Sequence, residues 1–349
     1  MHIVAHGICL EPSMHARVTM ASLSKALGLS ESTISRALRG DPRISKATRE
    51  RVAELAQKLG YRPNPLVSAL MSVRKKRGGS EVGTVALVTD YHGEGGWRSK
   101  DVCQWEYAGI CRRADELGYR VEEFPMSDFG YDPMKLEKVL LTRGIRGVLL
   151  GFSRDRTERA EFGVGKFTVA GLSTYFREFP VDRANFHGFF NVQLALGKMR
   201  AAGYRRTGLV VPEFNNRISG YLWSGGALDW QTRQAESDRC VPFIPTAGKE
   251  EKEFTKWLNR EKPDSLLVYK FPVQSWLSKS GLRVPEDLGL AYLYRTEDEM
   301  KTWPGIDGNL QAVGAAAFDL VVEGLHTYRL GPPEHPKDVL IKGEWKLNC

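Results

Sequence analysis

Three polar residues on one short helical pattern have the chemistry to bind nucleic-acid bases. Within residues 18–38, apolar side chains recur at helical intervals on both sides of a Gly-Leu-Ser turn, and the second run places Glu31, Ser32 and Arg36 on its solvent side. An arginine can contact guanine O6 and N7 together, which discriminates between bases by about 1–3 kcal/mol. The spacing therefore predicts a helix-turn-helix in which these three side chains read base edges. An ordinary helical hairpin with a solvated polar face is the alternative.

Hydroxyl side chains on the same helices suit the sugar-phosphate backbone. Thr19, Thr33 and Ser35 are predicted to contact phosphates, which positions a helix without carrying sequence information. Gly28 is predicted to end the first helix and Ser30 to cap the second. The packed stripe of the two helices is expected at Leu23, Ala26, Leu27, Leu29, Ile34, Ala37 and Leu38.

A third helix completes a small all-α unit. Within residues 41–61 it is predicted to begin after Ser45 and to end at Gly60, and its buried side is expected at Val52, Leu55, Ala56 and Leu59. Pro63 and Pro65 forbid its continuation, but Pro65 can begin a short new helix that runs to about Val73. Residues 1–17 lack the basic start and long apolar core of a signal peptide and are interpreted as a loose tail.

The excess positive charge of the chain lies entirely in this first segment. Residues 1–79 contain 14 Lys and Arg against 5 Asp and Glu, a net of +9, whereas the remaining residues carry 36 against 37, a net of −1. A basic unit joined to a nearly neutral one is typical of phosphate binding, and it predicts an affinity that falls steeply with salt.

The rest of the chain is long enough for two α/β lobes. After Glu81, apolar runs alternate with helical patterns: VGTVALVTD, EYAGICRRADELGY, RVEEFPM, PMKLEKVLLTRG and IRGVLLGF. A second series follows, with a helix over 186–204, RTGLVVPE, a helix near 217–235, CVPFIPT, a helix over 249–262, PDSLLVYK and VPEDLGLAYLY. This rhythm is typical of parallel sheets covered on both faces.

The phrases VTMASLSKALGLSESTISRALRG and SKATRERVAELAQKLGYRPN resemble the head of the lac repressor family of bacterial transcription regulators. Weaker matches continue to about residue 346, among them Tyr107-Ala108-Gly109-Ile110 and Val284-Pro285-Glu286-Asp287-Leu288. The resemblance implies an all-α helix-turn-helix head with a hinge helix, followed by a periplasmic-binding-protein-like α/β domain of two doubly wound lobes. The expected divisions are a tail 1–17, a head 18–62, a hinge and linker 63–79, and an effector-binding and dimerisation domain 80–349. Its N-lobe is expected at about 80–180 and 305–333, and its C-lobe at about 181–304 and 334–349.

Within the hinge, the resemblance implies that Leu70 enters the minor groove at the centre of the DNA site, flanked by Met71. Such a wedge costs a few kcal/mol of unstacking, which is offset by contacts to the bent duplex. Val67 stands where the family usually has alanine, and Pro65 is an additional proline, so the hinge geometry departs from the family. A plain core leucine is the alternative for Leu70.

In the two lobes, the resemblance implies a small-molecule effector at the carboxyl ends of the strands. Arg217 falls at the family position whose guanidinium holds the effector, and a surface ion pair is its alternative. Lys270-Phe271 and Tyr294 replace the usual Asn-Asp pair and Asp, so a sugar or sugar derivative is one candidate among several. Tyr91, Trp97, Phe271 and Tyr294 are expected to give an aromatic cleft instead, although each can equally be a core residue.

Other function classes find little support. The seven histidines pair with no nucleophile, and Gly163-Val164-Gly165-Lys166 fails the spacing of a phosphate-binding loop. The five cysteines contain no Cys-x2-Cys pair. We therefore expect no enzymatic activity, no cofactor and no metal site. No segment has the roughly 20 apolar residues of a membrane span. An odd number of cysteines without a secretory signal indicates free thiols in a reducing compartment, so we expect a cytoplasmic protein. The expected partners are double-stranded operator DNA, an effector and a second copy of the chain. A transport-type binding protein and an α/β enzyme fused to a DNA-binding head are the rivals.

Overall fold

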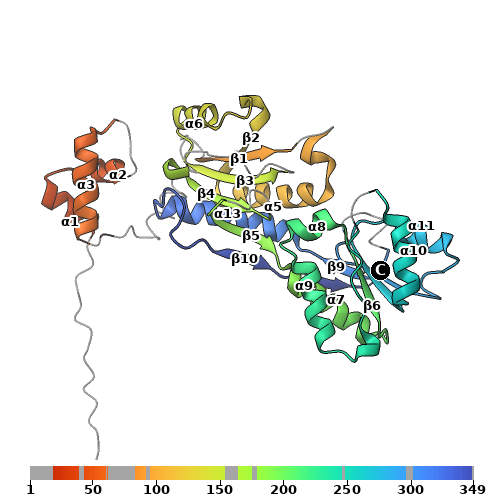
Figure 1. The fold of residues 1–349 in the computed structure, drawn as a ribbon. Coiled ribbons are helices and arrows are strands. Elements are labelled where there is room, and N and C mark those ends of the chain that lie inside the picture. Colours follow the sequence, from red (N-terminus) through yellow and green to blue (C-terminus); the bar gives the residue numbers. More distant parts are fainter. Residues whose placement is uncertain are drawn as a thin grey trace, which may run out of the picture. The chain divides into compact units, whose positions relative to one another are not determined.

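The computed structural model describes residues 19–38, 43–59, 61, 83–91, 95–153, 164–174, 179–245, 248–295 and 302–347. The chain divides into two compact units, Met1–Gly78 and Gly79–Cys349. Figure 1 shows the three helices of the first unit, α1 Met20–Leu27, α2 Glu31–Leu38 and α3 Lys46–Lys58.

The three helices of the first unit enclose a small apolar core, as the periodicity predicts. Its buried side chains are Leu23, Ile34, Ala37, Val52 and Ala56. Two predictions of buried residues are wrong: Ala26 on α1 is exposed, and Leu59 at the end of α3 is 40% exposed. Leu59 is the C-cap of α3, at the end of the helix.

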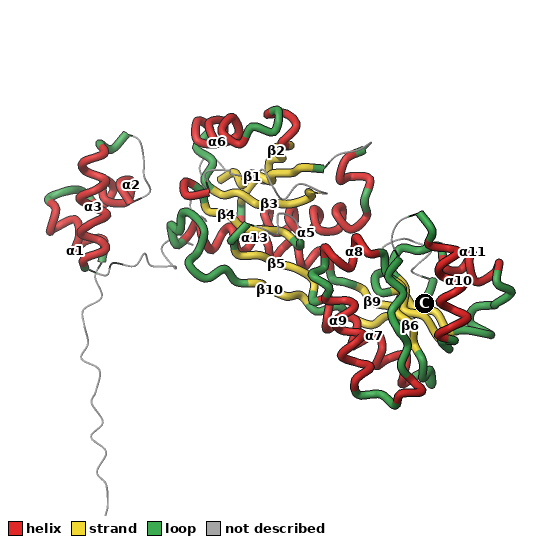
Figure 2. The backbone as a smooth tube through the Cα atoms, in the orientation of Figure 1, coloured by secondary structure: helices red, strands yellow, loops and turns green. Residues whose placement is uncertain are grey.

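The second unit consists of two sheets with helices on their faces (Figure 2). The six-stranded sheet of the N-lobe is parallel throughout, in the order β10 Asp338–Ile341, β5 Asp182–Phe186, β4 Thr168–Leu172, β3 Gly147–Ser153, β1 Gly83–Asp90, β2 Tyr119–Pro125. Its helices are α5 Asp101–Leu117, α6 Pro133–Thr142 and α13 Leu310–His326. Separate apolar clusters lie on its two faces, which explains why the strands are nearly continuous apolar runs.

The C-lobe repeats this construction with five strands. Their order is β11 Glu344–Lys346, β9 Gly305–Asp307, β8 Gly289–Tyr292, β7 Ser265–Val268, β6 Thr207–Val210, and only β11 runs antiparallel to its neighbour. The helices of this lobe are α7 Gly188–Ala201, α8 Glu213–Ile218, α9 Leu222–Thr232, α10 Glu250–Glu261 and α11 Val273–Lys279.

The expected lobe boundaries are wrong at each crossing. β5 and β10 complete the N-lobe sheet, whereas β9 and β11 belong to the C-lobe sheet. The chain therefore crosses between lobes after β5, between β9 and α13, and between β10 and β11. Sequence pattern identifies a strand but carries no information on which of two sheets it joins.

Two local expectations in the C-lobe also need correction. The single helix near 217–235 is two helices, α8 and α9, because Gly220 and Tyr221 take left-handed backbone angles of 72° and 61° in φ. Of the predicted strand CVPFIPT, the described residues 240–245 form one isolated bridge, between Phe243 and Val210, rather than a strand. Its two prolines, Pro242 and Pro245, have no N–H to donate to a sheet.

Candidate DNA interface and ligand site

The helix-turn-helix is built by local hydrogen bonds at its turn. Gly28 adopts a left-handed φ of 64° and ends α1, and Ser24 Oγ donates to the Leu29 carbonyl at 2.5 Å. The Thr33 backbone N–H donates to Ser30 Oγ at 3.2 Å, which satisfies one of the free amides at the start of α2. The polar residues of the turn therefore fix the direction in which α2 leaves it.

The two faces of α2 have opposite character. Ile34 and Ala37 are buried against the other helices, whereas Glu31, Ser32 and Arg36 are exposed. Arg36 has no partner among the described residues, so its guanidinium is available to an external acceptor. This is the arrangement that reading a major groove requires, because the base-contacting side chains must point away from the core.

The predicted phosphate contacts lie at or near helix starts. Thr19 caps α1, with its hydroxyl accepting from the Ser22 N–H at 3.2 Å, and Thr33 lies in the first turn of α2. Thr33 and Ser35 are half-buried. Ser30 Oγ lies 2.8 Å from Thr33 Oγ1 and 2.9 Å from Ser32 Oγ, so a hydroxyl cluster surrounds the amino end of α2. Amides and hydroxyls at a helix start favour phosphate oxygens.

Leu70 and Met71 lie outside the described residues, as do the whole predicted hinge 63–79 and the tail 1–17.

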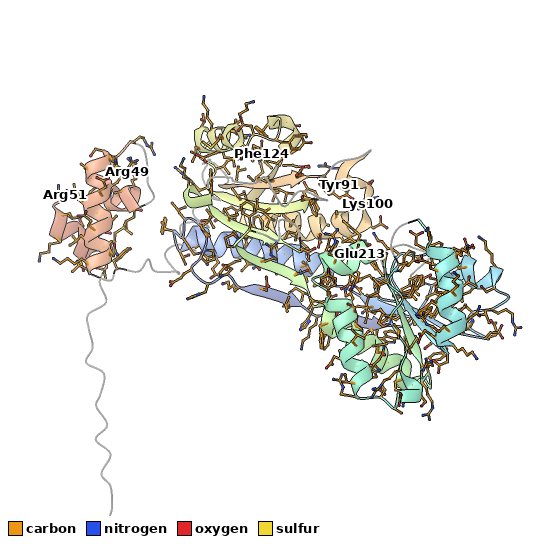
Figure 3. The ribbon with its side chains drawn as sticks, in the orientation of Figure 1. Arg49, Arg51, Tyr91, Lys100, Phe124 and Glu213 are labelled. Atoms are coloured by element: carbon orange, nitrogen blue, oxygen red, sulfur yellow. The ribbon has the colours of Figure 1, made fainter. Side chains whose placement is uncertain are left out.

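Arg217 lies on α8 with its side chain 54% exposed. Its Nε is 3.5 Å from a Glu213 carboxylate oxygen one turn earlier, and its guanidinium lies 5.5 Å from the centre of the Phe214 ring. Figure 3 labels Glu213 at the start of α8 and Tyr91 just after β1. Such an exposed pair contributes little to stability, so Arg217 can exchange Glu213 for a ligand at small cost.

Four aromatic residues were expected to form a cleft, and the structure places two of them in lobe cores. Trp97 is 3% exposed, stacks on Phe152 and donates from Nε1 to Glu123 Oε1 at 2.6 Å. Tyr294 is 4% exposed within the C-lobe core. These two rings are packed by the protein itself and do not present an open aromatic surface.

The other two aromatic residues, Tyr91 and Phe271, are half-buried. Phe271 packs 5.2 Å from Trp276 and 6.5 Å from Phe243, ring centre to ring centre.

The sequence reasoning missed a buried acid on α5. Glu106 is fully buried; its Oε1 accepts a short hydrogen bond from Ser173 Oγ at the end of β4, and Oε2 has no hydrogen-bond partner. Burial raises the pKa of Glu106 to about 8, an effect that the Ser173 hydrogen bond partly opposes. The signal was present, since Glu106 falls on the apolar stripe of Cys103, Ile110 and Ala114.

A second missed residue is Asn191, in the first turn of α7. Its Nδ2 donates to the Tyr294 hydroxyl at 3.1 Å, and its Oδ1 accepts from the Gly343 N–H at 2.8 Å. Gly343 lies in the third crossing between the lobes. Asn191 therefore joins a C-lobe core tyrosine to a lobe crossing.

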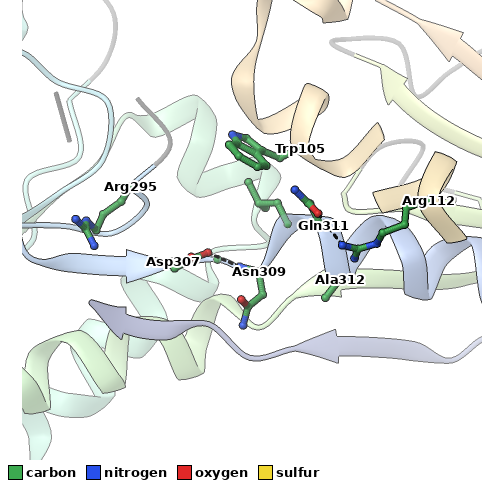
Figure 4. Close-up of a pocket in the computed structure, with 9 residues that line it drawn as sticks. Trp105, Arg112, Arg295, Asp307, Asn309, Gln311 and Ala312 are labelled. Carbon is green, nitrogen blue, oxygen red and sulfur yellow. Dashed lines mark hydrogen bonds between the residues drawn. The ribbon is translucent and has the colours of Figure 1, made fainter. Parts of the chain in front are cut away.

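A pocket of about 370 Å³ lies where the second crossing enters α13 (Figure 4). Its size falls in the range of small-molecule sites. None of the five predicted effector residues lines it; the lining is Trp105, Arg112, Arg295, Asp307, Gly308, Asn309, Leu310, Gln311 and Ala312.

Within the described parts of the chain, no cluster of His, Cys, Asp and Glu could hold a metal ion. No described helix is both long enough and apolar enough to cross a membrane.

Comparison with known proteins agrees with this architecture. Residues 19–64 match the family model described as bacterial regulatory proteins, lacI family. The chain is 24% identical over 306 residues to the HTH-type transcriptional regulator DegA of Bacillus subtilis (strain 168). The aligned region covers 78% of this chain and 80% of DegA.

Two solved structures share the fold over nearly the whole chain. The CelR–cellobiose complex covers 95% of this chain and 99% of its own, with a TM-score of 0.55 and 17% identity. The lac repressor dimer bound to operator and the anti-inducer ONPF covers 94% and 97%, with a TM-score of 0.53 and 17% identity.

A basic helix-turn-helix unit joined to a two-lobed parallel α/β unit defines a DNA-binding transcriptional regulator. The head carries the family's own pattern, and the similarity to DegA extends over most of both proteins. Residues 19–64 thus carry the pattern of the lacI family of bacterial regulatory proteins.

Proposed function

We propose that the protein is a cytoplasmic, homodimeric repressor without catalytic activity, and that a small-molecule effector bound between its lobes controls its affinity for an operator. The observation that carries the proposal is the exposed face of α2, with Glu31, Ser32 and Arg36 opposite a buried apolar face in a strongly basic segment. Two-fold symmetry of a dimer requires two-fold symmetry in its DNA, so each head reads half of a near-palindromic site.

Selection from a random double-stranded oligonucleotide library tests the DNA-binding part. The full chain is expected to enrich a near-palindromic sequence, because two identical heads must contact equivalent half-sites. Recovery of a library with no enriched sequence would overturn sequence-specific regulation. Measurement of mass in solution with and without the enriched DNA tests the dimer.

Support for an effector comes from the two-lobed fold and from Arg217, whose exposed guanidinium contacts Glu213 and the ring of Phe214. Solved relatives of similar fold include one in complex with cellobiose, which makes sugars the first compounds to try. A thermal-shift screen against sugars, nucleobases and acidic metabolites identifies binders, since a ligand stabilises the folded state by mass action.

The role of Arg217 is tested with the compound that the screen identifies. Arg217→Ala is expected to leave operator affinity unchanged and to abolish the response of DNA binding to the compound. Arg239→Ala, which removes another exposed arginine of the C-lobe, is the matched control. A full response in Arg217→Ala refutes its role.

A further inference from the structure

Glu31 is the only acidic residue of α1 and α2, two helices that the structure describes in full. It is exposed, and it lies in a segment that carries 14 basic residues against 5 acidic ones. DNA phosphates repel a carboxylate, so an acid on a DNA-binding surface weakens the attraction to every sequence. Such a charge is useful on this surface only where it makes a contact that favours some sequences over others.

The carboxylate of Glu31 has no partner among the described residues of the head. Ser30 Oγ, rather than Glu31, accepts from the Thr33 N–H at the start of α2. Glu50 on α3 provides a contrast, because its carboxylate lies 3.8 Å from Lys46 Nζ. Both carboxylate oxygens of Glu31 are therefore available to a donor outside the chain.

Helical geometry places Glu31 and Arg36 on either side of Ser32. Ser32 points away from the buried pair Ile34 and Ala37, because it lies about 170° around the helix from the middle of that pair. Arg36 lies about 40° from Ser32 on one side, and Glu31 about 100° from it on the other. Along the axis, Glu31 and Arg36 are separated by about 7.5 Å, which is close to two base-pair steps. In a helix that lies along the groove, the two side chains contact different base pairs.

A carboxylate can bond to only two groups in the major groove. It accepts hydrogen bonds and donates none, so its partners are the amino groups of cytosine, N4, and of adenine, N6. In an A·T pair the amino group lies between two acceptors, adenine N7 and thymine O4, and both repel a carboxylate. In a C·G pair an acceptor, guanine O6, lies on one side of N4 only. Cytosine is therefore the better partner for Glu31.

Resting on the proposed function, we infer that Glu31 is a specificity residue that accepts a hydrogen bond from cytosine N4, about two base pairs from the guanine that Arg36 contacts. The carboxylate also repels the phosphates of unrelated DNA, so it increases discrimination while it lowers the overall attraction. An acid in the first turn of α2 also interacts favourably with the helix dipole, but that effect would leave the base preference unchanged.

Parallel selections from a random double-stranded library test this assignment with the full chain and its Glu31→Gln variant. Glutamine has nearly the size of glutamate, and it both donates and accepts, so it pairs with adenine N6 and N7. The wild type is expected to prefer cytosine at one position of each half-site by about fivefold or more. The variant is expected to change this position to adenine, to keep the guanine that Arg36 contacts, and to bind unrelated DNA more tightly.

Glu54→Gln is the matched control, because it removes the same charge from an exposed position on α3. It is expected to keep the cytosine. A Glu31→Gln variant that selects the same base at every position overturns the inference, and so does a wild-type base other than cytosine at the position that changes. These results leave sequence-specific binding intact. A wild type that enriches no sequence overturns the proposed function and this inference with it.

Discussion

Arg36 and Glu106 show opposite ways in which one side chain can signal function. Arg36 is exposed and without a partner among the described residues, so its charge is directed to something outside the chain. Glu106 is fully buried, where a charged carboxylate is strongly disfavoured. Arg36 is informative because it is exposed. Glu106 is informative because a carboxyl group is buried where its charged form is disfavoured.

Arg36→Ala is expected to weaken binding to the selected operator by about 1–3 kcal/mol and to relax the preference at one base pair in each half-site, since a bidentate contact is lost. Fluorescence anisotropy with the operator and with single-base variants measures both effects. Arg51→Ala removes the same charge from the exposed face of α3 and serves as control. Equal losses on every sequence would contradict base reading by Arg36.

Glu106 makes the stability of the second unit depend on pH. The acid stays protonated in the folded state up to about pH 8, whereas it ionises near its usual 4.5 in the unfolded chain. Its contribution is therefore complete below about pH 4.5 and is lost as pH rises to about 8, a change on the order of 5 kcal/mol. Wild type is expected to lose stability relative to Glu106→Gln across this range, measured by urea unfolding. Parallel pH profiles would show that Glu106 is not neutral in the folded protein.

At the scale of elements, the N-lobe depends on the close approach of α5 and α13. Gly109 faces the Gln311 carbonyl and Gly314 faces the Glu106 carbonyl, each with room for no side chain. Helix α13 also packs against β3, β4 and β5. Because this helix is buried along much of its length, it fixes the position of the α5 backbone at Glu106.

Gly314→Ala is expected to destabilise the second unit by about 1–3 kcal/mol or more, because its Cβ would lie 2.0 Å from a backbone oxygen. Gly225→Ala in α9 meets nothing within 4 Å and is expected to stabilise by about 0.5–1 kcal/mol through helix propensity. Urea unfolding followed by tryptophan fluorescence compares the two. A Gly314→Ala variant as stable as Gly225→Ala would contradict the tight packing.

At the scale of the whole molecule, hydrogen bonds connect the three lobe crossings. The His187 N–H donates to the Ile341 carbonyl at 2.8 Å, Asn309 Nδ2 to the Lys342 carbonyl at 2.9 Å, and the Gly343 N–H to Asn191 Oδ1 at 2.8 Å. A change at one crossing must therefore disturb the others. This connection gives a ligand between the lobes a physical route to alter their relative arrangement.

The charge division predicts a steep salt dependence of operator binding. With 14 basic against 5 acidic residues in 1–79, we expect several phosphate contacts, and affinity should fall by about 10³-fold or more between 50 and 200 mM salt if six or more form. Thr33→Val is expected to weaken binding to all sequences alike without changing the slope, because it removes a hydroxyl and no charge. A slope near zero would mean that the head does not neutralise phosphates.

Much of the architecture could be predicted from the sequence, because local rules act within a few residues. Gly28 and Ser30 mark the turn, helical spacing places Ile34 and Ala37 inside and Arg36 outside, and apolar runs mark β1 and β3. Those features depend on backbone geometry and the periodicity of burial, which neighbouring residues determine.

Only the tertiary structure decided which sheet receives β5, β9 and β10, and that Trp97 and Tyr294 are packed inside the lobes. It also decided that Glu106 is buried beside Ser173 and that Asn191 bonds to a lobe crossing. These outcomes depend on contacts between residues tens to hundreds of positions apart, which no local pattern encodes. The sequence by itself determined a basic reading head and a two-lobed α/β unit. The surroundings of each polar side chain, and hence the chemistry that a ligand must bring, were decided by packing.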